Sequence, residues 1–217
     1  MPKHAYVEYM PAGQITSEAN ENSPYVSADK LSCIRGGRLL FEQLSFSLAA
    51  GDSAQIIGPN GIGKSSLIRL IAGLLPMAAG EISAHGGFSL CDENLSFDQN
   101  KSLQGALSFW AKMSGQNEAA VISALADLNL TELADLPVRM LSTGQRKRAA
   151  LARTITSSAK IWLLDEPANG LDTASLTLLS SVMQRHLEGG GIIIAASHQP
   201  LDLANVQKIS LEQGAAS

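Results

Sequence analysis

The fold of this 217-residue chain is decided by the stretch Gly58-Pro59-Asn60-Gly61-Ile62-Gly63-Lys64-Ser65. This stretch has the pattern of a phosphate-binding P-loop, with glycine at its first position and Gly-Lys-Ser at its last three positions. The preceding residues, Ser53–Ile57, favour a short strand, and apolar residues recur at helical spacing from Lys64 to Leu75, where Pro76 follows. A strand before the loop and a helix after it are the context that a P-loop requires, whereas a chance glycine turn has no need of them.

The residue types of this loop suit a triphosphate. Glycines allow backbone N–H groups to turn inward and approach phosphate oxygens, and the helix that begins near Lys64 directs its positive end at the same anion. Lys64 would reach the β- and γ-phosphates, and the Ser65 hydroxyl would bind magnesium. We therefore expect ATP and Mg²⁺ as ligands, held by Gly58, Pro59, Asn60, Gly61, Ile62, Gly63, Lys64, Ser65 and Ser66.

Strand and helix patterns alternate along most of the chain. An antiparallel pair is expected over 26–34 and 39–48, joined by a turn at Gly36-Gly37, and buried strands over 161–164 and 191–197 with a last one over 206–211. Between about 93 and 140 only helical periodicity occurs, over 103–113 and 119–130; a further helix is expected over 174–186. The pattern predicts an α/β fold with a P-loop NTPase core on a parallel sheet, an antiparallel β subdomain near the N-terminus and an inserted helical subdomain. Residues 1–25 show no period and are expected to be a disordered tail.

Two carboxylates end a buried apolar strand in Ile161-Trp162-Leu163-Leu164-Asp165-Glu166. Ligands collect at the carboxyl ends of parallel strands, so Asp165 is placed to hold magnesium. If the strand continued, Glu166 would face away from Asp165, and it is our candidate general base for an attacking water. The alternative is a pair of solvated carboxylates in a turn.

His198 also follows a buried strand and could bond the γ-phosphate and position the water. The other histidines are assigned structural positions: His4 in the tail, His85 in a turn and His186 on a helix surface. Cys33 and Cys91 lie far apart without metal-type spacing, which favours two reduced thiols.

A second anion site is predicted at Leu141-Ser142-Thr143-Gly144-Gln145, which precedes a helix expected over 146–156. Ser142 and Gln145 have the spacing of a capping box, so an ordinary helix cap is one interpretation. The other is that Ser142, Gly144 and Gln145 present hydroxyl and N–H groups to a phosphate. One nucleotide can use both anion sites only if two copies of the chain face each other head to tail.

The composition limits the classes of partner. The formal net charge is −4, from 16 basic and 20 acidic residues, which argues against a nucleic-acid partner. No apolar run is long enough to cross a bilayer, so a membrane role would require other subunits.

The motifs and their order resemble an ABC transporter ATP-binding subunit: the P-loop, a helical insert, Leu-Ser-Thr-Gly-Gln, Asp165-Glu166-Pro167, Gly170-Leu171-Asp172 and His198. The resemblance covers about 26–213 and implies one ABC ATPase domain whose insert spans about 93–140. It implies that Lys64, Glu166 and His198 are catalytic and that Ser65 and Asp165 hold the metal. It also implies a homodimer in which Asp172 lies at the interface. In that dimer Ser142, Gly144 and Gln145, here called the Ser142 edge, contact the γ-phosphate of the nucleotide bound by the partner.

Within that family the sequence is most similar to the ATP-binding subunit of the haem exporter of cytochrome c biogenesis. Ser197-His198-Gln199-Pro200-Leu201 carries this narrower resemblance, because most relatives have an aspartate after the histidine. It implies ATP-driven, haem-transporting export, integral membrane partners of the cytochrome c biogenesis system that dock on the insert, and a peripheral position on the cytoplasmic face of the bacterial inner membrane.

Three positions depart from the family pattern. Glu93-Asn94 stands where the Q-loop glutamine is expected, and Gln99 comes late for a substitute. Arg35 stands where an adenine-stacking aromatic is expected and could itself stack on the base. Thr143 replaces a glycine.

Three alternatives stay open on the sequence alone. They are the ATPase subunit of another ABC exporter, a soluble ABC ATPase that acts on ribosomes or nucleic acid, and a nucleotide sensor that does not hydrolyse.

Overall fold

The computed structural model describes residues 23–92, 97–199, 201–203 and 206–211. Most of the expected N-terminal tail, including His4, and the Glu93-Asn94 pair lie outside the described residues, as does Pro200. The first strand begins at Tyr25, so the last residue of the expected tail belongs to the folded part.

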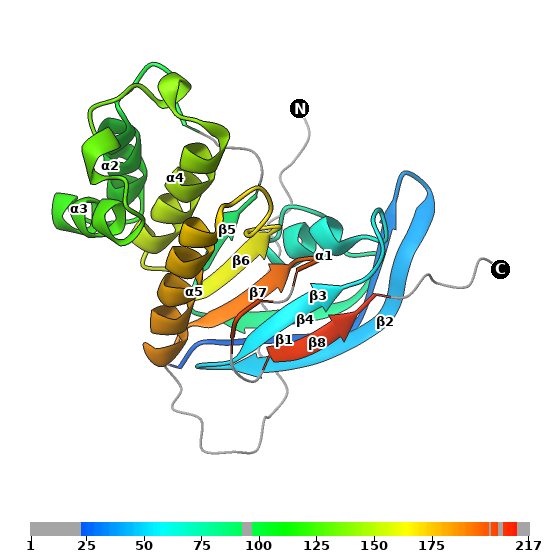
Figure 1. Ribbon diagram of the computed structural model, residues 1–217. Helices are drawn as coiled ribbons and strands as arrows, with labels where there is room; N and C mark the ends of the chain where they lie inside the picture. Colours follow the sequence, from blue (N-terminus) through cyan, green and yellow to red (C-terminus); the bar gives the residue numbers. More distant parts are fainter. Residues whose placement is uncertain (1–22, 93–96, 200, 204–205, 212–217) are drawn as a thin grey trace, which may run out of the picture.

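Two sheets carry the described strands, and both expectations of sheet type are confirmed (Figure 1). The antiparallel sheet has the order β2-β1-β4 and consists of β1 (Tyr25–Arg35), β2 (Arg38–Ala49) and β4 (Ala79–His85). The second sheet is parallel throughout, with the order β5-β6-β7-β3-β8. Its strands are β3 (Ser53–Ile57), β5 (Phe88–Cys91), β6 (Ile161–Asp165), β7 (Ile192–Ala196) and β8 (Val206–Ser210).

Helices cover both faces of the parallel sheet. On one side α1 (Lys64–Ile71) lies between the two sheets, and on the other lies α5 (Thr173–Glu188). A separate helical lobe is visible in Figure 1. It contains α2 (Leu103–Met113), α3 (Glu118–Asp127), the short 3₁₀ helices η1 (Thr131–Leu133) and η2 (Val138–Met140), and α4 (Thr143–Thr156).

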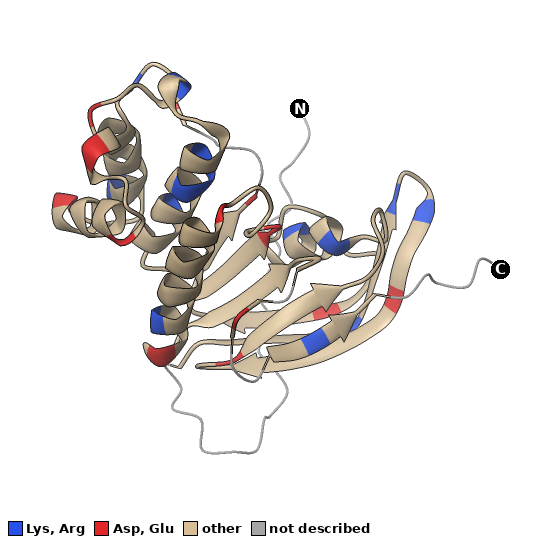
Figure 2. Cartoon of the chain, in the orientation of Figure 1, with Lys and Arg blue, Asp and Glu red and all other residues tan. Residues whose placement is uncertain are grey.

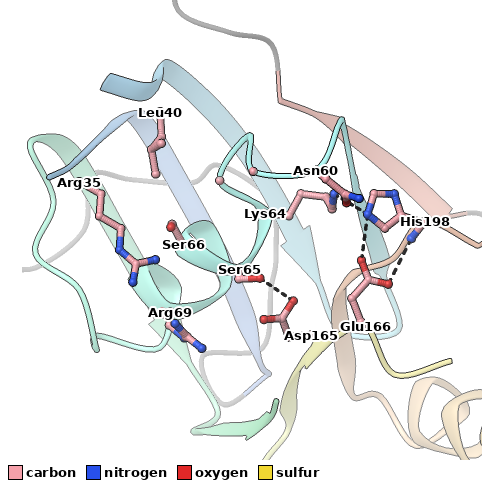
Figure 3. A pocket seen from close by; sticks show the side chains of 12 residues that line it. Arg35, Leu40, Asn60, Lys64, Ser65, Ser66, Arg69, Asp165, Glu166 and His198 are labelled. Carbon is pink, nitrogen blue, oxygen red and sulfur yellow. Dashed lines mark hydrogen bonds and ion pairs between the residues drawn. The ribbon is translucent and has the colours of Figure 1, made fainter. Parts of the chain in front are cut away.

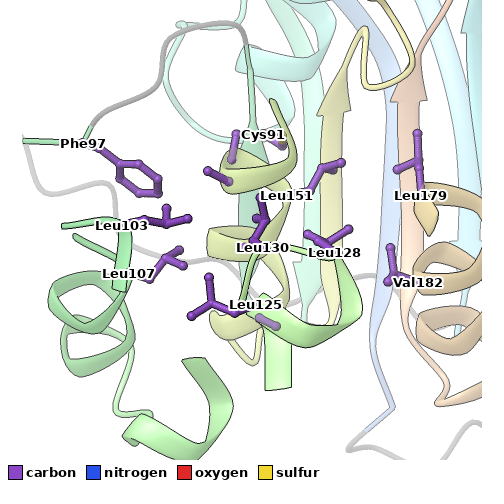
Figure 4. Packing of buried hydrophobic residues seen from close by; sticks show 14 of the residues in the cluster. Cys91, Phe97, Leu103, Leu107, Leu125, Leu128, Leu130, Leu151, Leu179 and Val182 are labelled. Atoms are coloured by element: carbon purple, nitrogen blue, oxygen red, sulfur yellow. The ribbon is translucent and has the colours of Figure 1, made fainter. Parts of the chain in front are cut away.

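Alternate side chains of β6 enter two different cores. Ile161 and Leu163 belong to the cluster that faces α1 and the antiparallel sheet, whereas Trp162 and Leu164 belong to the cluster shared with the helical lobe and α5. The second cluster joins α2, α3 and α4 to the sheet (Figure 4). Each buried aliphatic side chain contributes about 1.5–3 kcal/mol. A strand that is buried on both faces fixes its own register, and with it the position of the residues at its end.

Several element boundaries differ from the sequence prediction. The helix expected over 64–75 ends at Ile71, because Gly73 takes φ 73° and Leu74 N–H turns back to the Arg69 carbonyl at 2.8 Å. The helix expected from Arg146 begins at Thr143, directly after its cap. The helix expected to reach residue 130 ends at Asp127. Strands β4 and β5 were not predicted at all.

Two histidine assignments were wrong. His85 is not in a turn but is the last residue of β4, paired with Tyr25. His186 is not on a helix surface: its ring stacks on Trp162 with centroids 3.8 Å apart, and its Nε2–H donates to the Lys160 carbonyl at 3.1 Å. A Cβ atom on Gly191 would lie 2.2 Å from His186 Nε2, so the glycine makes room for the ring.

The half-buried ring of His186, which stacks on Trp162, predicts a pH-dependent stability. Burial lowers the pKa of His186 from 6.5 to about 4, against the opposing effect of the hydrogen bond to the Lys160 carbonyl. Because the unfolded chain binds the proton more readily, this contribution is complete above about pH 6.5 and is lost as the pH falls towards 4. We expect His186→Gln to be less stable than wild type at pH 7.5, and the difference in urea midpoint to shrink by pH 4.5. A difference that stays constant across this range would contradict the assignment.

Candidate active site

The carboxyl ends of three neighbouring strands place the predicted site residues together. β6, β7 and β3 lie side by side, the P-loop follows β3, Asp165 ends β6, and His198 comes two residues after β7. They border an open hollow of about 530 Å³ (Figure 3). Its lining consists of Arg35, Leu40, Asn60, Gly61, Gly63, Lys64, Ser65, Ser66, Arg69, Asp165, Glu166 and His198.

Lys64 is a buried cation whose charge has no carboxylate partner. Its Nζ donates to the carbonyls of Gly58 at 2.9 Å and Pro59 at 3.2 Å, so the side chain folds back over its own loop. Only 8% of Lys64 is exposed, and no ion pair in the described part of the chain involves it. The first N–H groups of α1 also receive no side-chain cap from Gly63. A site with an uncompensated ammonium and uncapped helix N–H groups fits an anion.

Two glycines make the loop backbone possible. Gly63 has φ 122°, and a Cβ there would lie 3.2 Å from the Cβ of Leu40. Gly58 has φ 149°, and a Cβ there would lie 3.0 Å from the Leu211 carbonyl oxygen. Both positions therefore require glycine, because the backbone conformation disfavours any residue with a Cβ atom and the neighbouring atoms leave no room for one.

Ser65 and Asp165 meet at the floor of the hollow. The Ser65 hydroxyl donates to Asp165 Oδ1 at 2.9 Å, which joins α1 to the end of β6. Burial raises the pKa of the Asp165 carboxyl, while this hydrogen bond and the nearby Arg69 act in the opposite direction. In the described residues no group of three or more His, Cys, Asp or Glu side chains could hold a metal alone. One hydroxyl and one carboxylate beside a phosphate site fit Mg²⁺, which takes most of its ligands from phosphate and water.

Glu166 lies beyond the end of β6, so the condition under which it would face away from Asp165, a strand continuing through it, is not met. Its φ of 50° is in the left-handed region, which costs a non-glycine residue about 1–3 kcal/mol. Its N–H donates to the Ala196 carbonyl of β7 at 2.8 Å, and its carbonyl accepts from Asn169 N–H at 3.2 Å. The turn directs the Glu166 carboxylate towards His198 (Figure 3).

The imidazole of His198 bridges the lysine and the glutamate. Its Nε2 lies 3.0 Å from Lys64 Nζ and 3.4 Å from Glu166 Oε1. One nitrogen cannot accept from the ammonium and donate to the carboxylate at once. In the shorter contact the Lys64 ammonium can only donate, so there the imidazole Nε2 is the acceptor.

Sequence reasoning missed the residue that holds the His198 loop. Gln55, in β3, is 8% exposed, and its Nε2 donates to the carbonyls of Ser197 at 3.1 Å and Gln199 at 2.9 Å. An amide inside a buried strand needs partners, so the signal was the single Gln within Ser53–Ile57.

The far end of the hollow is lined by Arg35, Leu40 and Arg69, of which only Arg35 was considered from the sequence. Arg69 forms an ion pair of 3.7 Å with Asp92. No Phe, Tyr or Trp is among the residues that line the hollow. A flat ring bound at this end of the hollow would contact the guanidinium of Arg35 or Arg69 and the aliphatic side chain of Leu40.

The Ser142 edge does not line this hollow. The capping box is present: Ser142 Oγ accepts from Gln145 N–H at 3.3 Å, and the Gln145 side chain accepts from Ser142 N–H at 2.8 Å. Ser142 is exposed and Gly144 half-buried. The predicted second anion site is therefore a preformed helix start that the chain's own P-loop does not use. Gln99 donates to the Phe97 carbonyl at 3.3 Å and is likewise absent from the lining.

None of the helices in the described part of the chain combines the length and the apolar character needed to cross a bilayer.

Comparison with known proteins gives consistent results. Residues 41–169 match the family model described as ABC transporter. The chain is 51% identical over 187 residues to the Cytochrome c biogenesis ATP-binding export protein CcmA of Zymomonas mobilis, covering 86% of this chain and 84% of the relative. It is 47% identical over 184 residues to the protein of the same name from Sphingopyxis alaskensis, covering 85% and 95%.

Solved structures show the same fold. A metal-chelate type ABC transporter in an inward-facing conformation matches with a TM-score of 0.76 at 27% identity, over 88% of this chain and 80% of that chain. An ABC transporter ATP-binding protein from Pyrococcus furiosus matches with a TM-score of 0.76 at 25% identity, over 86% and 97%.

The fit of the glycine loop can be tested with inorganic tripolyphosphate. Gly63→Ala would add a Cβ against Leu40 in a backbone conformation that alanine avoids, so the loop must shift. We expect binding to weaken about tenfold or more, which corresponds to about 1.4 kcal/mol or more in calorimetry. Gly115→Ala is the control, because Gly115 also has a positive φ but nothing within 4 Å. Equal affinities for the two variants would show that the loop does not bind the anion.

Proposed function

This chain belongs to the ABC transporter family of ATP-binding proteins, and from this membership we propose how its residues hydrolyse ATP for an exporter. The observation that carries the proposal is the convergence of Lys64, Ser65, Asp165, Glu166 and His198 on one hollow. The family supplies the ATPase activity, and the geometry supports a role for each side chain.

We propose that the P-loop residues 58–66 hold the triphosphate. Lys64 would release the loop carbonyls and His198 and neutralise the β- and γ-phosphates. Ser65 and Asp165 would hold Mg²⁺, Ser65 directly and Asp165 beside it. The bound Mg²⁺ would supply positive charge to the phosphate oxygens as negative charge develops on them.

We propose that Glu166 orients and deprotonates the attacking water. Its carboxylate lies on the rim of the hollow, apart from the Ser65–Asp165 pair. His198 would bond the γ-phosphate once Lys64 has moved to the phosphates. The Gln55 hydrogen bonds to the 197–199 loop would keep the imidazole in place.

We propose that two chains form a head-to-tail homodimer. Ser142, Gly144 and Gln145 would contact the γ-phosphate bound by the partner, which agrees with the exposure of Ser142 and with the absence of all three from the lining of their own chain's hollow. Asp172 already caps α5 by accepting from Ser175 N–H at 2.8 Å, and it would lie at the interface.

We propose that the dimer works beneath integral membrane subunits of the cytochrome c biogenesis system, on the cytoplasmic face of the bacterial inner membrane. The names of the relatives support export in cytochrome c biogenesis. The similarity of the sequence to the haem exporter supports haem as the cargo. The helical lobe of α2, α3 and α4 would receive a segment of a membrane subunit.

Lys64→Ala tests nucleotide binding. Removal of the ammonium leaves the phosphates without their nearest cation, so we expect binding of a fluorescent ATP analogue to be lost. Lys112→Ala, on the exposed surface of α2, is the control and should bind as wild type does. If Lys64→Ala still bound the analogue, the assignment of this loop as the triphosphate site would be wrong.

Glu166→Gln tests the general base. The amide cannot accept the proton of water, so we expect phosphate release to fall by about a hundredfold or more. Binding of ATP should persist, and a dimer should accumulate with ATP and Mg²⁺ in size-exclusion chromatography with light scattering. Glu188→Gln, at the end of α5, should hydrolyse at the wild-type rate. Wild-type phosphate release by Glu166→Gln would refute the assigned base.

A further inference from the structure

Three consecutive cations on α4 reach backbone carbonyls of different segments. Arg146 Nη2 donates to the Arg139 carbonyl at 2.9 Å, and Arg148 Nη1 to the Leu128 carbonyl at 2.9 Å. Both acceptors belong to the helical lobe. Lys147 Nζ instead donates to the Asn169 carbonyl, in the loop between β6 and α5. In Figure 2 the blue segments on the α4 ribbon mark its basic residues.

Asn169 ends the turn that begins at Glu166. Its N–H donates to the Glu166 carbonyl at 3.2 Å, so the lysine is attached to the last residue of that turn. Glu166 holds its left-handed φ of 50° only because the surrounding contacts impose it. A charged donor bonded to the Asn169 carbonyl opposes relaxation of the turn more strongly than a neutral donor would.

Lys147 and Glu166 also border the same small cavity. The cavity has a volume of about 20 Å³, and its lining includes Cys91, Asp165 and Pro167. This volume is close to the space of a single water molecule. The hydrogen bond to the Asn169 carbonyl is therefore the contact through which a change in the position of Lys147 would reach the turn.

The same helix begins with the exposed Ser142 cap. Lys147 follows Gln145 by two residues, within the first turns of α4, and helices move as rigid elements. Lys147 thus connects the Ser142 edge, the proposed γ-phosphate contact, to the Glu166–Asn169 turn that carries the proposed general base.

We propose that Lys147 is a positioning residue for ATP hydrolysis, which ties the Ser142 helix to the Glu166–Asn169 turn and holds the Glu166 carboxylate in place. The inference rests on the proposed function of Glu166. Lys147 is not among the described residues that line the nucleotide hollow, so its loss should alter the rate and not the binding of ATP.

Three variants test this role in the full-length chain, alone and with the proteins that co-purify from detergent extracts. Lys147→Met keeps the length of the side chain and removes the donor, Lys147→Arg keeps a donor, and Arg146→Met removes a neighbouring cation that binds only the helical lobe. We expect Lys147→Met to lower kcat about tenfold with KM for ATP within about twofold of wild type. Lys147→Arg should recover most of the rate, and Arg146→Met should retain it.

Hydrogen exchange provides a second readout that needs no turnover. Amides of 165–171 should exchange faster in Lys147→Met than in Arg146→Met, whereas those of α5 should not change. A wild-type kcat in Lys147→Met, or unchanged exchange over 165–171, would overturn the positioning role. Absence of ATP hydrolysis by the wild-type chain would instead overturn the proposed function, and the exchange data would still show whether Lys147 holds the turn.

Discussion

The adjacency of β6, β7 and β3 is the constraint on which the site depends. Their carboxyl ends meet at one edge, so residues separated by a hundred or more positions in sequence lie within hydrogen-bond distance. Ser65 reaches Asp165 at 2.9 Å, and Lys64 reaches His198 at 3.0 Å. The register of these strands is held by apolar side chains that alternate between two cores, so the packing of the sheet determines the geometry of the site.

The hollow in one chain holds the machinery for one side of a triphosphate. Lys64 and the helix start of α1 provide positive charge, and Asp165 and Glu166 are the proposed metal holder and general base. The Ser142 edge is preformed by its capping box, which is worth about 1 kcal/mol, yet it does not line this hollow. In the proposed homodimer, one nucleotide would use the hollow of one chain and the Ser142 helix start of the other at the same time.

The amino-acid sequence predicted the P-loop, the strand before Asp165 and the parallel sheet, because glycine patterns and continuous apolar runs are local signals. It did not predict β4, whose residues are exposed or half-buried and whose pairing with β1 is a long-range contact. The four residues of β5 were too short to show a period. The burial of His186 depends on Trp162 and Gly191, which are distant in sequence, and the role of Gln55 depends on a loop that follows another strand. Contacts of this kind exist only after the sheet has formed.

Interchain crosslinking tests the head-to-tail nucleotide site most directly. Asn60 and Ser142 are both exposed, whereas the native Cys33 and Cys91 are buried, so Asn60→Cys and Ser142→Cys can be placed on two differently tagged chains. Glu166→Gln in both chains prevents turnover. The account predicts that ATP and Mg²⁺ induce a short-range crosslink between the two different tags. A dimer that binds ATP but yields no such crosslink would contradict it.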